Sequence, residues 1–280
     1  GPFAFEQCFS LKRVSLSTSL QTIKCGTFLK CKSLEQITIP TSVTSIEKAA
    51  FGFCASLLQI EILSSVTSTE DMVFSRCTSL EQVIISSSLK EIKLNCFFDC
   101  PSLKEITIPS SVTSIGETAF YACKSLEHVD IPSSVTFIDQ YAFNKYTSLK
   151  QVIIPSSVIL IKKGTFSGCT SLTDVSIPTS VTSIGESAFD ECKNLVQITI
   201  PDSVTLIEKG AFSECISLKQ IVLSNSINSI NNSVFRRCLS LTQITLPSSV
   251  SSIEDYAFNE CSSLRQIAFP SSIKSLGKYT

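Results

Sequence analysis

The sequence predicts a solenoid of stacked short coils with a parallel β-sheet running along one side. Three columns of residues lead to this fold class: a Phe column, a Cys column three residues later and an unbroken Leu column three residues after that. Phe stands at 5, 28, 51, 74, 97, 120, 143, 166, 189, 212, 235 and 258, always 23 residues apart. A constant period of this length indicates units that complete their hydrophobic core only by packing on their neighbours.

Each unit has the same internal order, L-x-x-I-x-I-P-x-S-V-x-x-I-x-x-x-A-F-x-x-C-x-S, which residues 103–125 show almost unaltered. Residues 34–39 alternate polar and apolar side chains and predict a half-buried strand. Pro40 cannot donate to a ladder, so the strand ends there and the next two residues turn the chain. Residues 43–46 predict a second, shorter strand, and one helical or 3₁₀ turn then carries Phe51 and Cys54 back toward the next Leu.

Serine occupies two corners of the unit. One column runs from Ser19 to Ser272 without exception, and the other, which includes Ser33, is broken only by Asn194. We expect the hydroxyls to bond to backbone groups that lose their ladder partners at these corners. We interpret residues 1–280 as a single domain of about twelve 23-residue units, and Gly1-Pro2 as the remnant of a cleaved tag.

The segment from Ile108 to Gly116, with Ala119-Phe120 and Cys123, is similar to the BspA-like class of leucine-rich repeats, and the similarity covers essentially the whole chain. The resemblance implies a right-handed, curved solenoid with the parallel sheet on its concave face. It also implies a role in adhesion to host matrix or to other cells, or as an interaction scaffold, and it implies no catalytic residues. The chain departs from the pattern at Ser17, Leu63, Ser86 and Ser224 in place of Pro, at Thr69 in place of Ile and at Tyr146 in place of Cys.

Charge and hydrophobicity exclude two classes of partner. Lys and Arg number 23 against 24 Asp and Glu, and no basic run occurs, so binding of nucleic acid through bulk charge is not expected. No apolar run approaches the roughly 18 residues of a spanning helix, and no secretory signal is visible. A cell-surface or secreted location follows from the resemblance, and a cytoplasmic location is the alternative because the chain holds many cysteines.

The 13 cysteines favour a buried, reduced core over disulfides or a metal. Eleven share the column at 23-residue spacing, and none forms the C-x₂-C pair that metal sites use. We therefore expect no metal and no cofactor, with the thiols acting as small hydrophobes and Cys96 buried as well. Only Cys25, in a slot that elsewhere holds polar residues, is predicted to be exposed and reactive.

The outward-facing strand residues form two columns, and the first is rich in glutamine. It reads Arg13, Gln36, Gln59, Gln82, Glu105, His128, Gln151, Asp174, Gln197, Gln220, Gln243 and Gln266. Stacked glutamines can bond to one another, which is a purely structural interpretation. The column is interrupted where Glu105, His128 and Asp174 fall, and Asp130 lies two residues from the single His.

This interruption is the candidate partner-binding site, with members Gln82, Glu105, His128, Asp130, Gln151, Ile153 and Asp174. A solvated polar surface with no ligand is the competing interpretation. An enzyme is not expected, because an open sheet face offers no pocket for a nucleophile and its base.

A second candidate is an apolar patch of Phe137, Ile159 and Leu160. The ends of the repeat carry no polar cap, so a homodimer formed end to end is a further hypothesis. The sequence thus predicts a non-enzymatic protein-interaction module, adhesin-like or cell-surface, whose partner is a host-matrix or cell-surface protein. An intracellular scaffold or regulatory protein is the alternative.

Overall fold

A computed structural model describes residues 1–280, which fall into two compact units, residues 1–135 and residues 136–280. Each unit is a stack of 23-residue coils without any helix, and each coil contributes strands to two rows. The first row holds the strands that precede the serine turn, and the second row holds the strands that follow it. The predicted fold class, a solenoid built on parallel strands, is confirmed.

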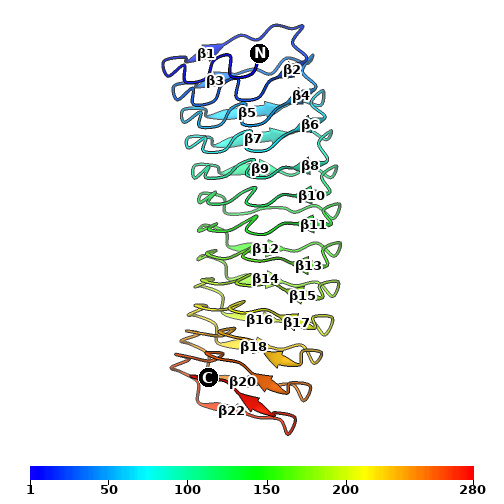
Figure 1. Cartoon of the computed structure of the whole chain (residues 1–280), viewed down its shortest axis with the longest axis vertical. Coiled ribbons are helices and arrows are strands. Elements are labelled where there is room, and N and C mark those ends of the chain that lie inside the picture. Colours follow the sequence, from blue (N-terminus) through cyan, green and yellow to red (C-terminus); the bar gives the residue numbers. More distant parts are fainter. The chain divides into compact units, whose positions relative to one another are not determined.

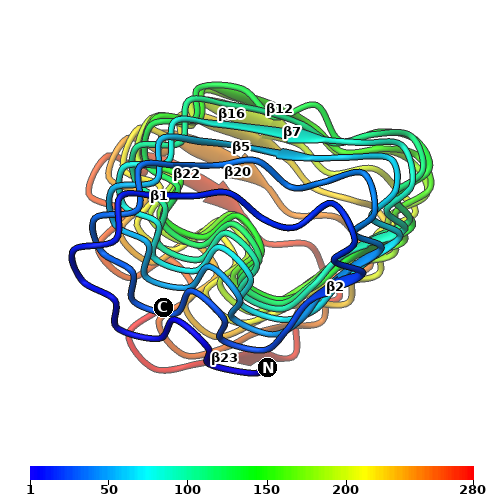
Figure 2. The same ribbon diagram turned by 90° about the horizontal axis from the view of Figure 1, so that it is seen from above.

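In residues 1–135 the two rows lie on different sides of the same coils (Figures 1 and 2). The first row consists of β1 (Arg13–Val14), β3 (Gln36–Ile37), β5 (Gln59–Ile62), β7 (Gln82–Ile85) and β9 (Glu105–Thr107). The second row consists of β2 (Thr22–Ile23), β4 (Ser45–Ile46), β6 (Ser68–Thr69), β8 (Glu91–Ile92) and β10 (Ser114–Ile115). The strands pair in parallel and join residues one period apart, such as Gln59 with Gln82.

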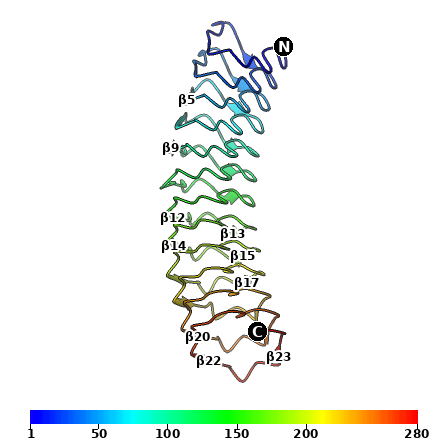
Figure 3. The same cartoon turned by 90° about the vertical axis from the view of Figure 1, so that its left-hand side faces the viewer.

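The second unit repeats this arrangement, with the rows again on separate sides (Figure 3). Its first row is β12 (Gln151–Ile153), β14 (Asp174–Ser176), β16 (Gln197–Thr199), β18 (Gln220–Val222), β20 (Gln243–Thr245) and β22 (Gln266–Ala268). Its second row is β11 (Phe137–Ile138), β13 (Leu160–Ile161), β15 (Ser183–Ile184), β17 (Leu206–Ile207), β19 (Ser229–Ile230), β21 (Ser252–Ile253) and β23 (Ser275–Leu276).

The segment that carries Phe and Cys is a run of turns, and the expected helical or 3₁₀ turn is absent. Residues 24–31 alternate between bonds within the coil, such as Leu29 N–H to the Gly26 carbonyl, and bonds to the next coil, such as Phe28 N–H to the Ala50 carbonyl. Two residues per coil have positive φ, for example Gly26 at 58° and Lys30 at 61°. A helix cannot continue through left-handed residues, and this alternation ties the turn side of each coil to its neighbour.

The core fills the space between the two rows and the turn segment with ladders of identical side chains. Phe28, Phe51 and Phe74 are fully buried, and successive rings stack 5.5 Å apart between centroids. Each column cysteine adds a hydrogen bond, as Cys54 does when its Sγ–H donates to the Phe28 carbonyl at 3.2 Å. These thiols are therefore donors to the backbone as well as small hydrophobes.

Serine hydroxyls join the coils at several turns after the first row, as predicted, whereas the buried hydroxyls of Ser65 and Ser203 in the same column have no hydrogen-bond partner. Ser42 donates to the carbonyl of Leu20 at 2.7 Å, and Ser88, Ser111, Ser134, Ser180 and Ser272 make the equivalent bond to the carbonyl 22 residues earlier. At the other serine column the backbone N–H groups of the serines bond to the preceding coil, as Ser56 N–H does to the Lys32 carbonyl. Both corners thus satisfy backbone groups that the strands leave unpaired.

Candidate binding surfaces

The outward side chains of the first row form the surface that the sequence singled out. Period-two alternation buries Ile60 and Ile62 and turns Gln59 and Glu61 to solvent. The glutamine column is exposed at every one of its positions. The predicted exposure of the whole column is therefore confirmed.

In residues 1–135 the structure brings Gln82 and Glu105 together. They are register partners on β7 and β9, and the Gln82 Nε2 amide donates to the Glu105 carboxylate at 3.2 Å. His128 and Asp130 are exposed on either side of buried Val129. Residues 126–132 form no strand, so the strand expected at His128 is absent. The ladder of first-row strands thus ends at β9 in this unit.

In residues 136–280 the structure pairs Gln151 with Asp174 and Ile153 with Ser176, on β12 and β14. Ile153 is 65% exposed, the largest value among the aliphatic side chains that face outward from the strands of either unit. The seven predicted site residues therefore fall into two groups, four in the first unit and three in the second. Each group contains one register pair with a carboxylate beside a glutamine.

Three hollows on this face were not predicted from the sequence. One, of about 210 Å³, lies in the first unit between β3, β5 and β7, with Gln59, Glu61 and Ile84 on its wall. Two lie in the second unit, with volumes of about 470 Å³ over β14, β16 and β18 and about 280 Å³ over β18 and β20. The only sequence signal for the latter two is a stretch of the glutamine column that carries no charge.

The apolar patch predicted at Phe137, Ile159 and Leu160 is exposed at 42%, 57% and 44%. It lies on the second row of the second unit, where β11 and β13 are side by side. The Lys162 ammonium lies 4.0 Å from the centre of the Phe137 ring and also pairs with Asp139 at 3.1 Å. A cation therefore covers part of this patch.

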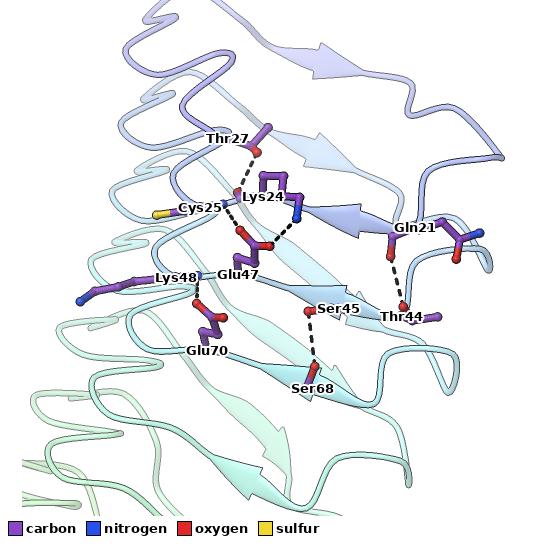
Figure 4. Close-up of polar contacts among 10 residues, drawn as sticks. All are labelled: Gln21, Lys24, Cys25, Thr27, Thr44, Ser45, Glu47, Lys48, Ser68 and Glu70. Atoms are coloured by element: carbon purple, nitrogen blue, oxygen red, sulfur yellow. Dashed lines mark hydrogen bonds and ion pairs between the residues drawn. The ribbon is translucent and has the colours of Figure 1, made fainter. Parts of the chain in front are cut away.

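Acidic side chains hold the corner where the second row meets the turn segment. The Glu47 carboxylate accepts from the Cys25 N–H and from the Lys24 ammonium, and Glu70 accepts from the Lys48 N–H (Figure 4). Hydrogen bonds from Lys24 and from the Cys25 backbone lower the pKa of the Glu47 carboxyl. These charged residues link successive coils at the second-row corner.

Ten of the 13 thiols are buried, and the prediction that only Cys25 is exposed needs correction. Cys25 is partly exposed, as are two positions of the column: Cys8 is exposed and Cys261 is partly exposed, and they lie in the first and last Phe-Cys segments of this chain. Elsewhere the column and Cys96 are buried, and burial raises the pKa of the Cys100 and Cys169 thiols to about 12.

No three His, Cys, Asp or Glu residues lie together in a way that could hold a metal ion. No helix has the length and apolar character needed to cross a membrane.

The fold and its repeat define the protein class as a leucine-rich-repeat solenoid. The sequence matches the family described as the BspA type leucine-rich repeat region (6 copies), over residues 1–127, 90–216 and 182–280. The chain belongs to this family, whose fold is typical of protein-interaction and surface-protein modules without enzymatic activity.

Solved structures of bacterial leucine-rich-repeat proteins resemble the chain over most of its length. A leucine-rich repeat protein from Bacteroides ovatus is 29% identical, with a TM-score of 0.84, over 99% of this chain and 77% of its own. A leucine-rich cell surface protein from Faecalibacterium prausnitzii is also 29% identical, with a TM-score of 0.66, over 98% of this chain and 82% of its own. Comparison with curated proteins gave no match.

Proposed function

We propose that this protein is a non-enzymatic adhesin-like module that binds a protein of the host matrix or of another cell surface through the first-row face. The observation that carries the proposal is the arrangement of that face, where exposed polar and apolar side chains stand in register on a rigid stack of strands. Support for the location comes from the similarity to the Faecalibacterium prausnitzii protein, which is described as a cell surface protein.

The binding centre is proposed at the breaks in the glutamine column. In the first unit these are His128, Asp130 and Glu105, whose carboxylate accepts a hydrogen bond from Gln82. In the second unit they are Asp174 with its partner Gln151, and the exposed Ile153 beside them. Carboxylates give a protein partner orientation and specificity, and an exposed isoleucine supplies apolar area that is desolvated on contact.

The buried thiols of the cysteine column do not conflict with an oxidising surface location. A thiolate is the form that reacts, and burial raises the pKa of Cys100 and Cys169 to about 12, so the reactive fraction at neutral pH is very small. The second candidate function, an intracellular scaffold, is favoured by the absence of any disulfide among the 13 cysteines. Antibody staining of the full-length protein on intact and permeabilised cells separates the two locations.

Reversal of charge at the proposed centre tests the function. We expect the double variant Glu105→Lys and Asp130→Lys to lose at least about tenfold in binding to immobilised extracellular-matrix proteins, measured by biolayer interferometry across a panel. Both side chains are exposed, so the thermal midpoint should change little.

The matched control is Glu91→Lys, an exposed strand residue on the second row of the same unit. This variant should bind as the unchanged protein does. Binding that survives the double reversal, or that falls equally in the control, rules out the first-row centre as the site.

A further inference from the structure

The two hollows of the second unit form one groove, because Gln220 and Val222 line both of them. The groove crosses β14, β16, β18 and β20, and its floor is the buried ladder of Ile198, Ile221 and Ile244. Pro201 and Pro247 lie on its wall, where the strands end. The groove therefore runs across successive coils on the first-row face, and a ligand within it would meet the same chemistry at each step.

The polar lining of this groove is neutral along three coils. Gln197, Gln220 and Gln243 project into it from equivalent positions on β16, β18 and β20, and Thr199 and Thr245 lie two residues beyond them. Asp174, on β14, is the only charged side chain of the lining. The first unit differs, because the charged residue Glu61 lines its hollow and the charged residue Glu105 lies on the next strand, β9.

The three glutamine carboxamides have no hydrogen-bond partner within the chain. The interpretation of the column as a self-bonded amide ladder therefore fails in this groove. Each carboxamide offers two N–H donors and one carbonyl acceptor, and each threonine hydroxyl both donates and accepts. The groove thus presents one free carboxamide per coil, at the strand spacing of about 4.8 Å, with a threonine hydroxyl beside it on β16 and β20 and Val222 in that position on β18.

Such a lining suits a polymer of hydroxyl groups better than a polypeptide. A sugar hydroxyl donates and accepts, so it pairs with either end of a carboxamide, and 1,4-linked pyranose units advance by about one strand spacing. An extended peptide rises about 3.3 Å per residue, so the spacing of its residues does not match the spacing of the coils. The groove also lacks the aromatic, arginine or deep apolar anchors that dominate protein binding.

We propose that the groove over β14, β16, β18 and β20 binds a neutral polysaccharide laid along the stack, with about one sugar per coil. The glutamine carboxamides and threonine hydroxyls bind its hydroxyl groups, Asp174 accepts from hydroxyls at one end, and Val222 contacts the C–H face of a ring. Because each sugar adds a similar weak contact, affinity rises with the length of the glycan. This ligand differs from the protein partner proposed above, and the two sites share Asp174, so the test of the protein site is placed at Glu105 and Asp130 and the test of the groove at its glutamines.

Isothermal titration with neutral oligosaccharides of glucose, mannose and galactose, from two to six units long, tests the proposal on the full chain. At least one series should bind, with affinity that increases from the disaccharide to the hexasaccharide. The triple variant Gln197→Ala, Gln220→Ala and Gln243→Ala should weaken hexasaccharide binding at least about tenfold, since it removes the hydrogen-bonding groups of three successive coils.

The control is the pair Gln36→Ala and Gln59→Ala, which removes the same side chains from the first unit and should leave binding unchanged. The thermal midpoints of all variants check that the fold persists. The single variant Gln220→Glu keeps the side-chain length and should also weaken glycan binding. No binding of any hexasaccharide at millimolar concentration overturns the proposal. It is equally overturned if the triple variant binds normally, or if the groove takes up an uncharged extended peptide but no glycan.

Discussion

At the scale of single residues, the turn segment places side chains in a conformation that L-residues rarely adopt. One column of positive φ holds Gly164 at 57°, Ser187 at 52° and Gly210 at 63°, so the same slot is occupied by glycine and by serine in successive coils. A left-handed residue with a Cβ costs roughly 1–2 kcal/mol, whereas glycine carries no such steric cost. Serine at this slot is therefore strained.

Replacements in this column should change the free energy of unfolding in a direction that depends on whether glycine is gained or lost. Ser187→Gly should raise the free energy of unfolding by about 0.5–1 kcal/mol, because relief of strain exceeds the added chain entropy. Gly164→Ala should lower it, since an added Cβ would clash with the Tyr141 ring and the residue would keep its positive φ. Urea denaturation measures both. Ser252→Gly, in strand β21, is the control and should be destabilising; a gain there would refute the conformational explanation.

The carboxyl group of Asp190 makes the free energy of unfolding depend on pH. Burial raises the pKa of its carboxyl to about 6, a hydrogen bond from Ser213 lowers it in part, and the charges of Glu191 and Glu214 raise it further. The folded value is thus above the unfolded one, so this group stabilises the fold at low pH and loses that contribution as the pH rises from about 4 through 6.

Asp190→Asn should therefore raise the urea midpoint at pH 7 relative to the unchanged protein, and the difference should shrink at pH 4. The exposed residue Asp174, replaced by Asn, provides the matched control and should show a much smaller difference between the two pH values. An Asp190→Asn advantage that is equal at both pH values would contradict the assignment to this carboxyl.

At the scale of elements, two first-row strands are longer than the others, and both lie in coils without the usual proline. β5 and β7 are four residues long, and in their coils Leu63 and Ser86 replace the Pro of the repeat. The Ser86 N–H donates to the Ile62 carbonyl at 3.0 Å, a bond that proline cannot make. In these two coils the non-proline residue accompanies a longer strand, whereas β1 and β18, which are followed by Ser17 and Ser224, are not lengthened.

Ser86→Pro should lower the free energy of unfolding by about 1–3 kcal/mol, because it removes this bond and leaves the Ile62 carbonyl without its donor. Ser86→Ala keeps the N–H and should cost less. Ser87→Pro, at the next position of the turn, where proline is favoured, should also be tolerated. Equal losses for Ser86→Pro and Ser86→Ala, measured in urea, would show that the hydroxyl and not the N–H matters.

At the scale of the whole molecule, each unit is stabilised by interactions between neighbouring coils. In the first unit the Phe rings from Phe5 to Phe120 stack at centroid distances of 5.4 to 5.5 Å. An interior ring has two such neighbours, whereas Phe5 has only Phe28 and is 43% exposed. Stability is then close to a sum over coils and their interfaces.

Phe74→Ala should cost about 3–5 kcal/mol, as expected for a buried aromatic side chain. Phe5→Ala should cost less than half of that, because much of its ring is already in water. Urea denaturation followed by circular dichroism compares the two. Equal losses would mean that the first coil contributes as much as the interior, against the nearest-neighbour description.

The sequence by itself determined the repeat, its two rows of strands, the buried Phe, Leu and Cys columns and the exposure of the glutamine column. These follow from local patterns, because a fixed period and polar-apolar alternation specify which side chain faces the core. The sequence also located Glu105, His128 and Asp130 as the interruption of that column, and serine as the residue of the corner.

Only the tertiary structure decided the rest. The turn segment became alternating left-handed turns because its N–H groups bond to the next coil, a partner that no local pattern specifies. The strand at His128 is missing, although the local pattern there matches that of its neighbours. The unbonded amides of Gln197, Gln220 and Gln243, and the groove that they line, depend on how successive coils are set against one another, which is a property of the stack and not of any single repeat.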